Sequence, residues 1–401
     1  MKILMVNKFL YPNGGSETYI FKLGEYLTSV GHEVQYFGME DERNIVGNNV
    51  GSYTSNMDFH GGSISKCIYP FKTIYSFEAR KKIRKVLDDF KPDVVHLNNI
   101  NFQLTPSVIY EVKKKRIPLF QTVHDPQVVC PNHRLYIEKK EIVCDKCISG
   151  RYMNCMKNKC LDNSIMKSFI AMVESYIYHT LKTYNKIDKY ICPSKFMAGK
   201  LIEGGINSSQ IDVMHNFSDK VVTTCQHKAG EKYALYFGRI SIEKGIKTLI
   251  QVCKELPEIK FIFAGSGPLS DSLHGIKNIE YVGFKKGKEL RDLIEEAVFT
   301  VYPSEWYDNC PLSIIESQAY GTPVIGADIG GIPELIIHNH TGLIFESGNK
   351  LELKKAIKRL YTDDDLEKQM IKECLSQKNN SIDIYADKLI CKYQRMMEAK
   401  A

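Results

Sequence analysis

The chain has 401 residues, enough for two or three domains at roughly 150 residues each, and 43% of them are hydrophobic and 25% charged. These values exclude disordered, collagen-like and coiled-coil chains, and no uncharged apolar run reaches the length of about 18 residues that predicts a membrane-spanning helix. The net charge of +7 favours an anionic substrate or surface. Because the chain opens directly on a strand-like run without signal-peptide features, we expect a cytoplasmic protein whose twelve cysteines are thiols or metal ligands.

Strand-like apolar runs alternate with helix-like segments along the chain, which predicts parallel α/β sheets. Polar residues without periodicity at 216–231 mark a junction. We therefore predict two doubly wound, Rossmann-like domains facing a cleft, an N-terminal one over 1–216 and a C-terminal one over 217–384, with a last helix at 385–401 packed back on the first. The predicted strands are 2–7, 32–38, 93–99, 118–125 and 189–194 in the first domain, and 233–239, 260–267, 279–284, 299–304, 322–327 and 342–345 in the second.

Two cations close to glycines follow the first strand of the second series. Gly238 and Arg239 stand at the end of that strand, and Lys244 comes five residues later, before a predicted helix. A guanidinium fork and a point charge suit a diphosphate, and ligands of open α/β sheets bind at the carboxyl ends of strands. Solvated surface charges are the alternative interpretation.

Two further glycine pairs stand beside predicted strands. Gly265 and Gly267 lack the Gly-Lys-Ser/Thr of a P-loop and the third glycine of a dinucleotide-binding fingerprint, which argues against an NTPase and a nicotinamide-dependent dehydrogenase. Near the N-terminus, Gly14 and Gly15 precede a predicted helix, where backbone amides can approach an anion. A tight turn with Ser16 as the N-cap is the alternative there.

The stretch 303–316 concentrates polar residues after a predicted strand. Asp308 lies in the loop, Pro311 opens a predicted helix, and Glu316 follows one to two turns later. The helix N-terminus can face a phosphate or a sugar oxygen. Asp308 can accept hydrogen bonds from hexose hydroxyls and Glu316 from those of a ribose. A solvent-facing carboxylate is the alternative for Glu316, but its sequence neighbours are apolar.

Taken together, these segments resemble retaining glycosyltransferases of family 4 over nearly the whole chain. The resemblance rests on Gly14-Gly15-Ser16-Glu17, Val123-His124-Asp125, Cys192-Pro193-Ser194, Asn216, Gly238-Arg239 through Lys244-Gly245, and the stretch from Asp308 to Val324. It implies the GT-B fold and transfer of a sugar from a UDP- or GDP-sugar to a glycan or a polyprenyl-linked glycan, as in bacterial surface-polysaccharide assembly.

The resemblance also assigns roles to residues. Arg239 and Lys244 would hold the diphosphate, Glu316 the ribose, and His124 would lie across the cleft against the donor sugar, although a lone histidine at a strand end could equally be a packed core residue. The expected catalytic residues are Arg239, Lys244, His124 and Asp308. Glu316 is expected to bind the donor. The residues expected to contact the donor are Gly15, Gly238, Gly265, Gly267, Asn309, Cys310, Pro311, Leu312 and Glu316.

One position departs from the family pattern. The family usually has two glutamates separated by seven residues, and Asp308 stands in the first place here. Because the aspartate side chain is one methylene shorter than that of glutamate, the identity of the donor sugar is not predicted. The family's usual proposal is a front-face displacement in which the leaving phosphate helps to deprotonate the acceptor, so we expect no cofactor requirement for catalysis. A nucleotide-sugar epimerase of the same fold, or a non-catalytic sugar-nucleotide-binding protein, are the alternatives.

An insertion at 130–160 is rich in cysteine. Cys144 and Cys147 have the spacing of a metal-binding knuckle, and Cys155 and Cys160 follow. Four thiolates at these spacings suit a structural zinc, whose binding energy would fold a polar, basic segment that has little apolar content. An iron–sulfur cluster and free thiols are the alternatives.

Residues 64–86 form a basic stretch with seven Lys or Arg, one acid and interleaved aromatics. Such a stretch can lie on anionic lipid at the inner face of the plasma membrane. A solvated helix face with aromatics packed inward is an equally good interpretation. Nothing resembles a nucleic-acid-binding module, so we expect no nucleic-acid partner.

Overall fold

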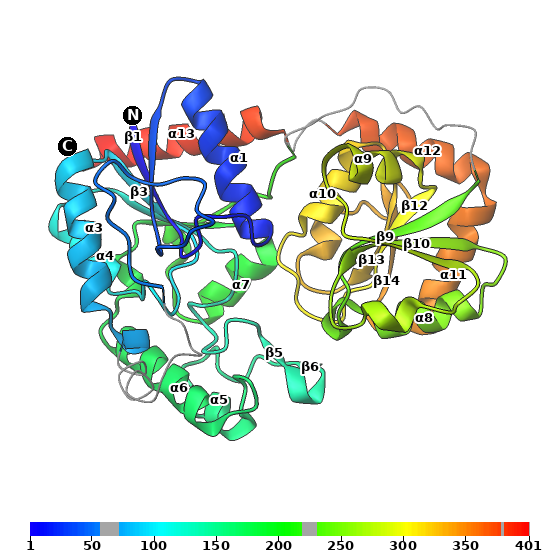
Figure 1. Ribbon diagram of the computed structural model, residues 1–401, viewed down its shortest axis with the longest axis horizontal. Helices are drawn as coiled ribbons and strands as arrows, with labels where there is room; N and C mark the ends of the chain where they lie inside the picture. The colour runs from blue at the N-terminus through cyan, green and yellow to red at the C-terminus, as the bar shows by residue number, and fades with distance from the viewer. Residues whose placement is uncertain (57–71, 219–230, 378–380, 401) are drawn as a thin grey trace. The chain divides into compact units, whose positions relative to one another are not determined.

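The computed structural model describes residues 1–56, 72–218, 231–377 and 381–400. The chain forms two compact units (Figure 1). The first unit comprises residues 1–139, 144–215 and 382–401, and the second comprises 140–143 and 216–381. No helix in the described ranges combines the length and the apolar character needed to cross a membrane.

The first unit is built on a six-stranded parallel sheet in the order β2-β1-β3-β4-β7-β8. The chain order reverses between β1 and β3, which makes their carboxyl ends a topological switch point, where open α/β sheets bind ligands. Most strand residues are buried, as expected for a sheet covered on both faces. The strands are β1 (Lys2–Val6), β2 (Glu33–Phe37), β3 (Val94–Leu97), β4 (Leu119–Thr122), β7 (Lys189–Cys192) and β8 (Ile211–Val213).

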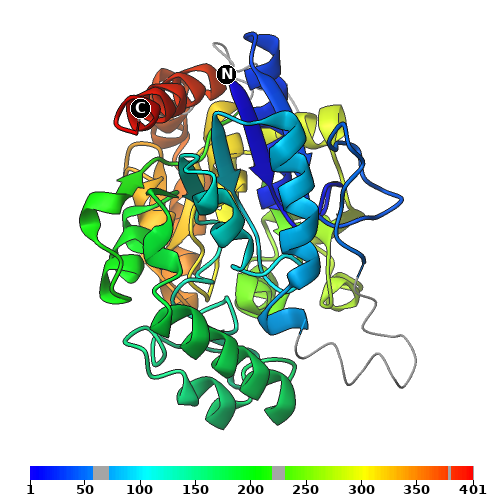
Figure 2. The same ribbon diagram turned by 90° about the vertical axis from the view of Figure 1, so that its left-hand side faces the viewer.

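Helices pack on this sheet through one apolar side. Figure 2 shows α3 lying across a face of the sheet, with five of its residues buried. The C-terminal helix α13 (Ile382–Glu398) packs beside α1 and buries Tyr385, Ala386, Leu389 and Tyr393. The other helices are α1 (Gly15–Ser29), α3 (Phe77–Phe90), α4 (Val108–Lys114) and α7 (Lys195–Glu203).

A segment with little regular structure separates β4 from β7. It contains the two-stranded sheet β5 (Tyr136–Ile137) with β6 (Ile142–Val143), the short helix α5 (Met153–Asn158) and the helix α6 (Ile165–Thr180). Ser164 caps α6 because its side chain accepts a hydrogen bond from the Lys167 backbone amide. The predicted cysteine-rich insertion falls in this segment.

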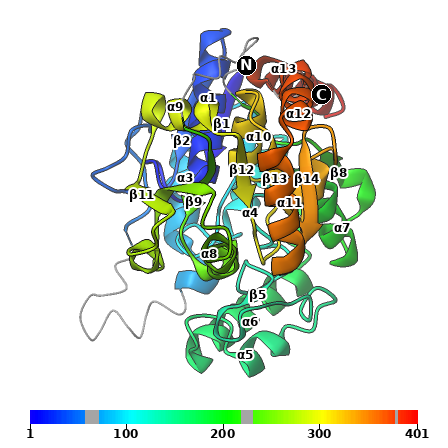
Figure 3. The same ribbon diagram turned by 90° about the vertical axis from the view of Figure 1, so that its right-hand side faces the viewer.

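The second unit has a six-stranded parallel sheet in the order β11-β10-β9-β12-β13-β14, which Figure 3 shows from β11 to β14. Its switch point lies between β9 and β12. The strands are β9 (Tyr233–Arg239), β10 (Lys260–Ser266), β11 (Ile279–Gly283), β12 (Phe299–Tyr302), β13 (Val324–Asp328) and β14 (Gly342–Glu346). The helices are α8 (Ile246–Lys254), α9 (Gly287–Glu296), α10 (Leu312–Ala319), α11 (Lys350–Thr362) and α12 (Asp364–Ser376).

Alternation along β9 shows that this sheet is covered on both faces. Ala234 and Tyr236 belong to the core cluster that includes residues of α8 and α11. Leu235 and Phe237, which point the other way, pack with Ile294 of α9. The predicted α/β class and doubly wound arrangement are therefore confirmed.

Candidate functional site

The switch point of the second sheet carries a lysine held by a carboxylate. Lys244, at the end of the short 3₁₀ turn Ile242–Lys244 after β9, places its Nζ 2.7 and 2.9 Å from the two carboxylate oxygens of Asp308 and 2.9 Å from the Tyr302 hydroxyl. Ser304 donates a hydrogen bond of 2.7 Å to Asp308 Oδ2. The structure thus brings together two residues that the sequence singled out separately.

Aromatic rings and close backbone packing fix this cluster. Lys244 Nζ lies 5.2 Å from the ring centroids of both Tyr302 and Trp306, within range of cation–π attraction. The Gly331 amide donates to the Asp308 carbonyl at 2.7 Å. A Cβ on Gly245, whose φ is +72°, would lie 1.8 Å from the Pro303 carbonyl oxygen, so only glycine fits there.

Arg239 is exposed at the end of the same strand, in the position expected of a phosphate ligand. Gly238 and Gly265 are register partners on β9 and β10, and both have φ near +147°. A Cβ on Gly265 would lie 1.9 Å from the Gly238 carbonyl oxygen, and one on Gly267 would lie 2.2 Å from that of Ile240. Because these glycines have no Cβ, the ends of β9 and β10 can approach each other closely. The backbone beside Arg239 is therefore not covered by a Cβ.

Helix α10 follows β12 and the Asp308 loop. It begins at Leu312, one residue later than predicted, so Pro311 is the N-cap, without a side-chain cap hydrogen bond. Cys310 is buried, and Asn216 donates to it twice: the backbone amide to Sγ at 3.3 Å and Nδ2 to the carbonyl at 2.8 Å. Asn309 and Glu316 are half-buried. The Cys310 side chain thus holds the loop, while the first turn of α10 keeps a positive helix end.

The first sheet presents amides at its switch point. Asn7, directly after β1, is buried; its Nδ2 donates to Glu17 Oε1 at 3.0 Å, and its Oδ1 accepts from the Asn99 amide at 3.0 Å. Ser16 donates to Glu17 Oε2 at 3.0 Å and does not cap α1, whose N-cap is Gly14. Gly15 is the exposed first residue of α1, where backbone amides stand at a positive helix end.

His124 lies just beyond the end of β4 in the first unit. Its Nε2 is 2.9 Å from Asn98 Oδ1, so this nitrogen carries the proton, and the ring packs edge-on against Tyr19 at 4.9 Å. Burial lowers the pKa of His124 to about 3, which keeps the imidazole neutral. These contacts fit the alternative of a packed core histidine, and a role of His124 at the donor sugar stays a prediction.

A buried hydrogen-bond network lies beneath His124. The Tyr19 hydroxyl is 3.2 Å from Thr122 Oγ1 and 2.7 Å from the Tyr385 hydroxyl of α13. Thr122 Oγ1 is 2.7 Å from His96 Nε2, and His96 Nδ1 is hydrogen-bonded to Tyr393 of α13. Burial lowers the pKa of His96 to about 3. Sequence reasoning missed this network, whose only signal was polar residues on apolar elements.

Lys8 and Asp125 are two further strand-end residues that sequence reasoning did not select. Burial lowers the pKa of Lys8, against the attraction of Asp125, and raises the pKa of Asp125 to about 6, against that of Lys8. The Gln127 amide donates to Asp125 Oδ1 at 3.0 Å. Their positions two residues after β1 and three residues after β4 were the available signal.

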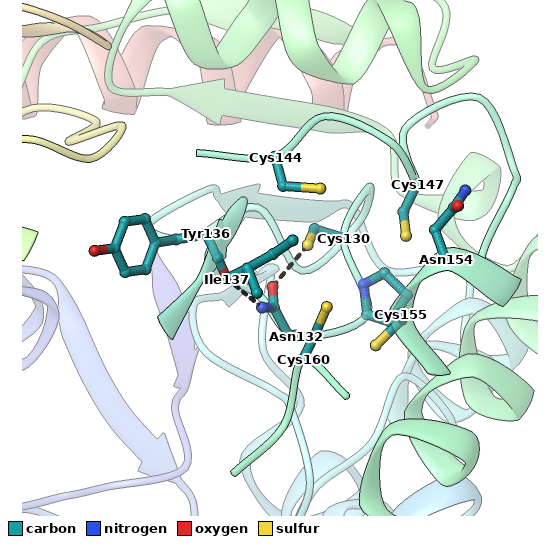
Figure 4. A pocket seen from close by; sticks show the side chains of 10 residues that line it. Cys130, Asn132, Tyr136, Ile137, Cys144, Cys147, Asn154, Cys155 and Cys160 are labelled. Carbon is teal, nitrogen blue, oxygen red and sulfur yellow. Dashed lines mark hydrogen bonds between the residues drawn. The ribbon is translucent and has the colours of Figure 1, made fainter. Parts of the chain in front are cut away.

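The cysteine-rich segment forms a small pocket in the first unit (Figure 4). Five cysteines line it: the predicted Cys144, Cys147, Cys155 and Cys160, together with Cys130. All five are free thiols, of which Cys130, Cys147 and Cys155 are buried. Within the described ranges, no three His, Cys, Asp or Glu side chains form a ready-made ligand set for a metal ion.

The basic stretch divides into two parts. Residues 64–71 lie outside the described residues. From Phe77, α3 buries an apolar face, and Arg80 and Arg84 pair with the buried Glu111 of α4. Phe77 itself is 75% exposed and contacts Tyr75 at 4.8 Å between ring centroids. Two of the positive charges of this stretch are thus held in ion pairs within the first unit. Membrane attachment stays a prediction.

Family models match both units. The model for "Glycosyltransferase Family 4" matches residues 13–220, and that for "Glycosyl transferases group 1" matches 223–375. A protein encoded in the cps region of Klebsiella pneumoniae, described as uncharacterized, is 24% identical over 84% of this chain and 87% of its own length. An uncharacterized glycosyltransferase of Methanocaldococcus jannaschii is 24% identical over 90% of each chain.

Solved structures share the fold at low sequence identity. Sucrose-phosphate synthase from Thermosynechococcus elongatus is 17% identical, covers 99% of each chain and has a TM-score of 0.72. Anabaena HepE, solved in complex with UDP, is 15% identical, covers 98% of this chain and 100% of its own, and has a TM-score of 0.69. These similarities confirm the predicted GT-B fold.

Proposed function

Because the chain belongs to glycosyltransferase family 4 and is a glycosyltransferase, we propose that it moves a hexose, with retention of anomeric configuration, from a UDP- or GDP-sugar to a glycan or lipid-linked glycan in polysaccharide synthesis. The observation that carries the donor part is the Lys244 ammonium held at the second sheet's switch point, with the exposed Arg239 on the adjoining strand end. The HepE structures with UDP and with UDP-glucose support a uridine nucleotide as the first donor to test.

In the proposed reaction, the bond between the sugar C1 and the diphosphate oxygen breaks while the acceptor oxygen forms a bond to C1 on the same face. The acceptor proton passes to the leaving phosphate. Arg239 and Lys244 stabilise the charge that develops on the diphosphate, which is preorganised electrostatic catalysis. The amides at the start of α10 add a positive helix end for a phosphate or sugar oxygen. Asp308 orients Lys244 through both carboxylate oxygens.

The acceptor part of the proposal places the acceptor on the first unit. Amide and imidazole groups at the ends of β1, β3 and β4 suit neutral hydroxyls, since Asn98 Nδ2 offers a donor and the neighbouring His124 is neutral. The relative from the Klebsiella pneumoniae cps region supports a role in polysaccharide synthesis. We expect Glu316 to contact the ribose.

The test uses the one tryptophan of the sequence, Trp306, which lies beside Lys244. Titration of UDP- and GDP-sugars should change its fluorescence for one nucleotide series. That donor is then incubated with polyprenyl-diphosphate-linked sugars, with and without EDTA, and the product linkage is assigned by NMR. A retained anomeric configuration and EDTA-insensitive turnover are expected. An inverted product, an isomerised sugar still on its nucleotide, or loss of turnover in EDTA would each contradict the corresponding part of the proposal.

A further inference from the structure

The thiols of the cysteine pocket come from separate turns of one segment. Cys130 lies in the loop that follows β4, Cys144 and Cys147 flank a turn after β6, and Cys155 and Cys160 lie in and after α5. In Figure 4 the side chains of Cys130, Cys144, Cys147 and Cys160 point toward one common space. The Cys155 side chain points away from Cys144 and Cys147. The four converging thiols are therefore not the four that spacing alone selects.

Cys155 has a different environment. It is 1% exposed and packs with Cys147, Tyr152 and Met172 in a small apolar cluster. A buried cysteine behaves as a small hydrophobic side chain in such a cluster. Cys160 packs against the same cluster and is hydrogen-bonded to Cys155, whereas Cys130 and Cys144 lie outside the cluster.

Polar groups of its own loop surround the sulfur of Cys130. The backbone amides of Asn132, Arg134 and Leu135 form hydrogen bonds to its sulfur. Amide donors of this kind support the negative charge of a metal-bound sulfur and orient it. The Cys130 thiol donates to Asn132 Oδ1 at 2.8 Å, and Asn132 Nδ2 donates to the Tyr136 carbonyl at 2.7 Å. The Cys144 amide donates to the Leu135 carbonyl at 2.8 Å. The loop from Cys130 is thereby linked to the Cys144 turn.

The backbone between β4 and β7 contains many residues in the left-handed conformation. Seven of the twelve non-glycine residues with positive φ in the described chain fall between β4 and β7: His133, Leu135, Glu141, Lys159, Asp162, Asn163 and Lys182. A left-handed conformation costs about 1 kcal/mol for a residue with a side chain, less for Asn and Asp. Buried side chains of the segment, among them Leu135, Ile137 and Tyr152, offset part of that cost. A structural metal supplies the missing free energy in segments of this kind.

We propose that Cys130, Cys144, Cys147 and Cys160 bind one structural Zn²⁺ ion, and that Cys155 is a packing residue beside the site. Binding forms four Zn–S bonds and releases four thiol protons to solvent. Four sulfur ligands leave no open position, so the ion has a structural role. The thiols close around the ion by side-chain rotation, since they do not yet enclose it.

The test measures zinc in the full-length chain, purified with reducing agent and without chelator. About one Zn²⁺ per chain is expected by mass spectrometry of the metal content. Cys130→Ser, Cys144→Ser, Cys147→Ser and Cys160→Ser should each lower occupancy at least tenfold under a competing chelator. Cys155→Ser and the matched control Cys253→Ser, a buried cysteine of the second unit, should keep the wild-type stoichiometry. Replacement by Co²⁺ should give thiolate-to-cobalt charge-transfer bands and the visible bands of tetrahedral coordination.

Three results would overturn the proposal: wild-type chain without zinc, a Cys155–Cys160 disulfide in the purified protein, or zinc retained by Cys130→Ser and lost by Cys155→Ser. If the serine variants fail to fold, the wild-type chain still decides. Stripping its zinc should release four additional thiols to a thiol-specific reagent, and no change in thiol reactivity would exclude the site. None of these readouts depends on glycosyltransferase activity.

Discussion

The carboxyl ends of the two sheets use burial in opposite ways. At the first sheet, burial works against charge: the pKa of His124 falls to about 3, that of Lys8 is lowered, and that of Asp125 rises to about 6. At the second, Lys244 and Asp308 are mostly buried but lie 2.7 Å apart, so each charge has its counter-charge. Related topologies thus end in a neutral histidine near Lys8 and Asp125 with shifted pKa values in one unit, and in a closely paired lysine and aspartate in the other.

This difference indicates a division of labour within one enzyme. A phosphate group is best held by fixed cations, whereas sugar hydroxyls are best held by neutral donors and acceptors. Variants that remove charge from the second unit, or add it to the first, therefore test whether the two units differ in this way.

The largest effect is expected when the second unit loses its buried cation. Lys244→Ala should lower kcat/KM by about 30- to 1000-fold, equivalent to about 2–4 kcal/mol, because charge on the leaving diphosphate loses a preorganised partner. Steady-state kinetics with the preferred nucleotide sugar measures this. Lys285→Ala, which removes a lysine paired only with Glu289 on the same unit, is the control and should leave kcat/KM unchanged. Wild-type turnover by the Lys244 variant would refute the proposed role.

Sequence patterns predicted most of the fold because buried parallel strands are apolar and end in loops with distinctive polar residues. All eleven predicted strands are present, within a few residues of their expected bounds. The three-residue strand β8, Ile211–Val213, was missed, since so short a run with half-exposed side chains carries no periodic signal.

The site was predicted less completely than the fold, and the reason is spatial. Arg239, Lys244 and Asp308 each stand at a strand end and could be selected one by one. The contact between Lys244 and Asp308 depends on β9 and β12 being neighbours, which the strand order decides and local sequence does not. His96 and Tyr393 lie 297 residues apart, so their hydrogen bond had no local signal.

A second prediction concerns the counter-charge. Asp308→Asn should lower kcat/KM about 10- to 100-fold, because the amide cannot hold the Lys244 ammonium with a full charge. The double variant Lys244→Ala/Asp308→Asn should lose little more than Lys244→Ala alone, because the carboxylate is proposed to act largely through the lysine. Fully additive losses would mean that Asp308 acts independently on the donor sugar. Ser304→Ala, which removes one hydrogen bond to the carboxylate, is a milder companion variant.

The third prediction concerns the charge that His96 gains when the pH is lowered. The folded-state pKa of His96 is about 3, below the value of about 6.5 in an unfolded chain, so the stability it contributes is fully present above pH 6.5 and is lost as pH falls toward 3. Between pH 7.5 and pH 5 that loss is about 2 kcal/mol. His96→Gln should remove it, so the difference in unfolding free energy between wild type and variant should shift by that amount. Denaturant titrations at both pH values test this, and an unchanged difference would show that His96 is already protonated in the fold.

The smallest effect is expected where the C-terminal helix touches the neutral network. Tyr393→Phe removes the hydroxyl bonded to His96 Nδ1 but keeps the ring against Phe120. The unfolding free energy should fall by about 1 kcal/mol, since one buried hydrogen bond is lost and His96 keeps only its bond to Thr122. Tyr26→Phe, at a half-buried position of α1, is the matched control. Equal stability of both variants would mean that α13 is held by its apolar residues alone. A loss confined to Tyr393→Phe would show that the last helix of the chain supports the polar layer beneath His124.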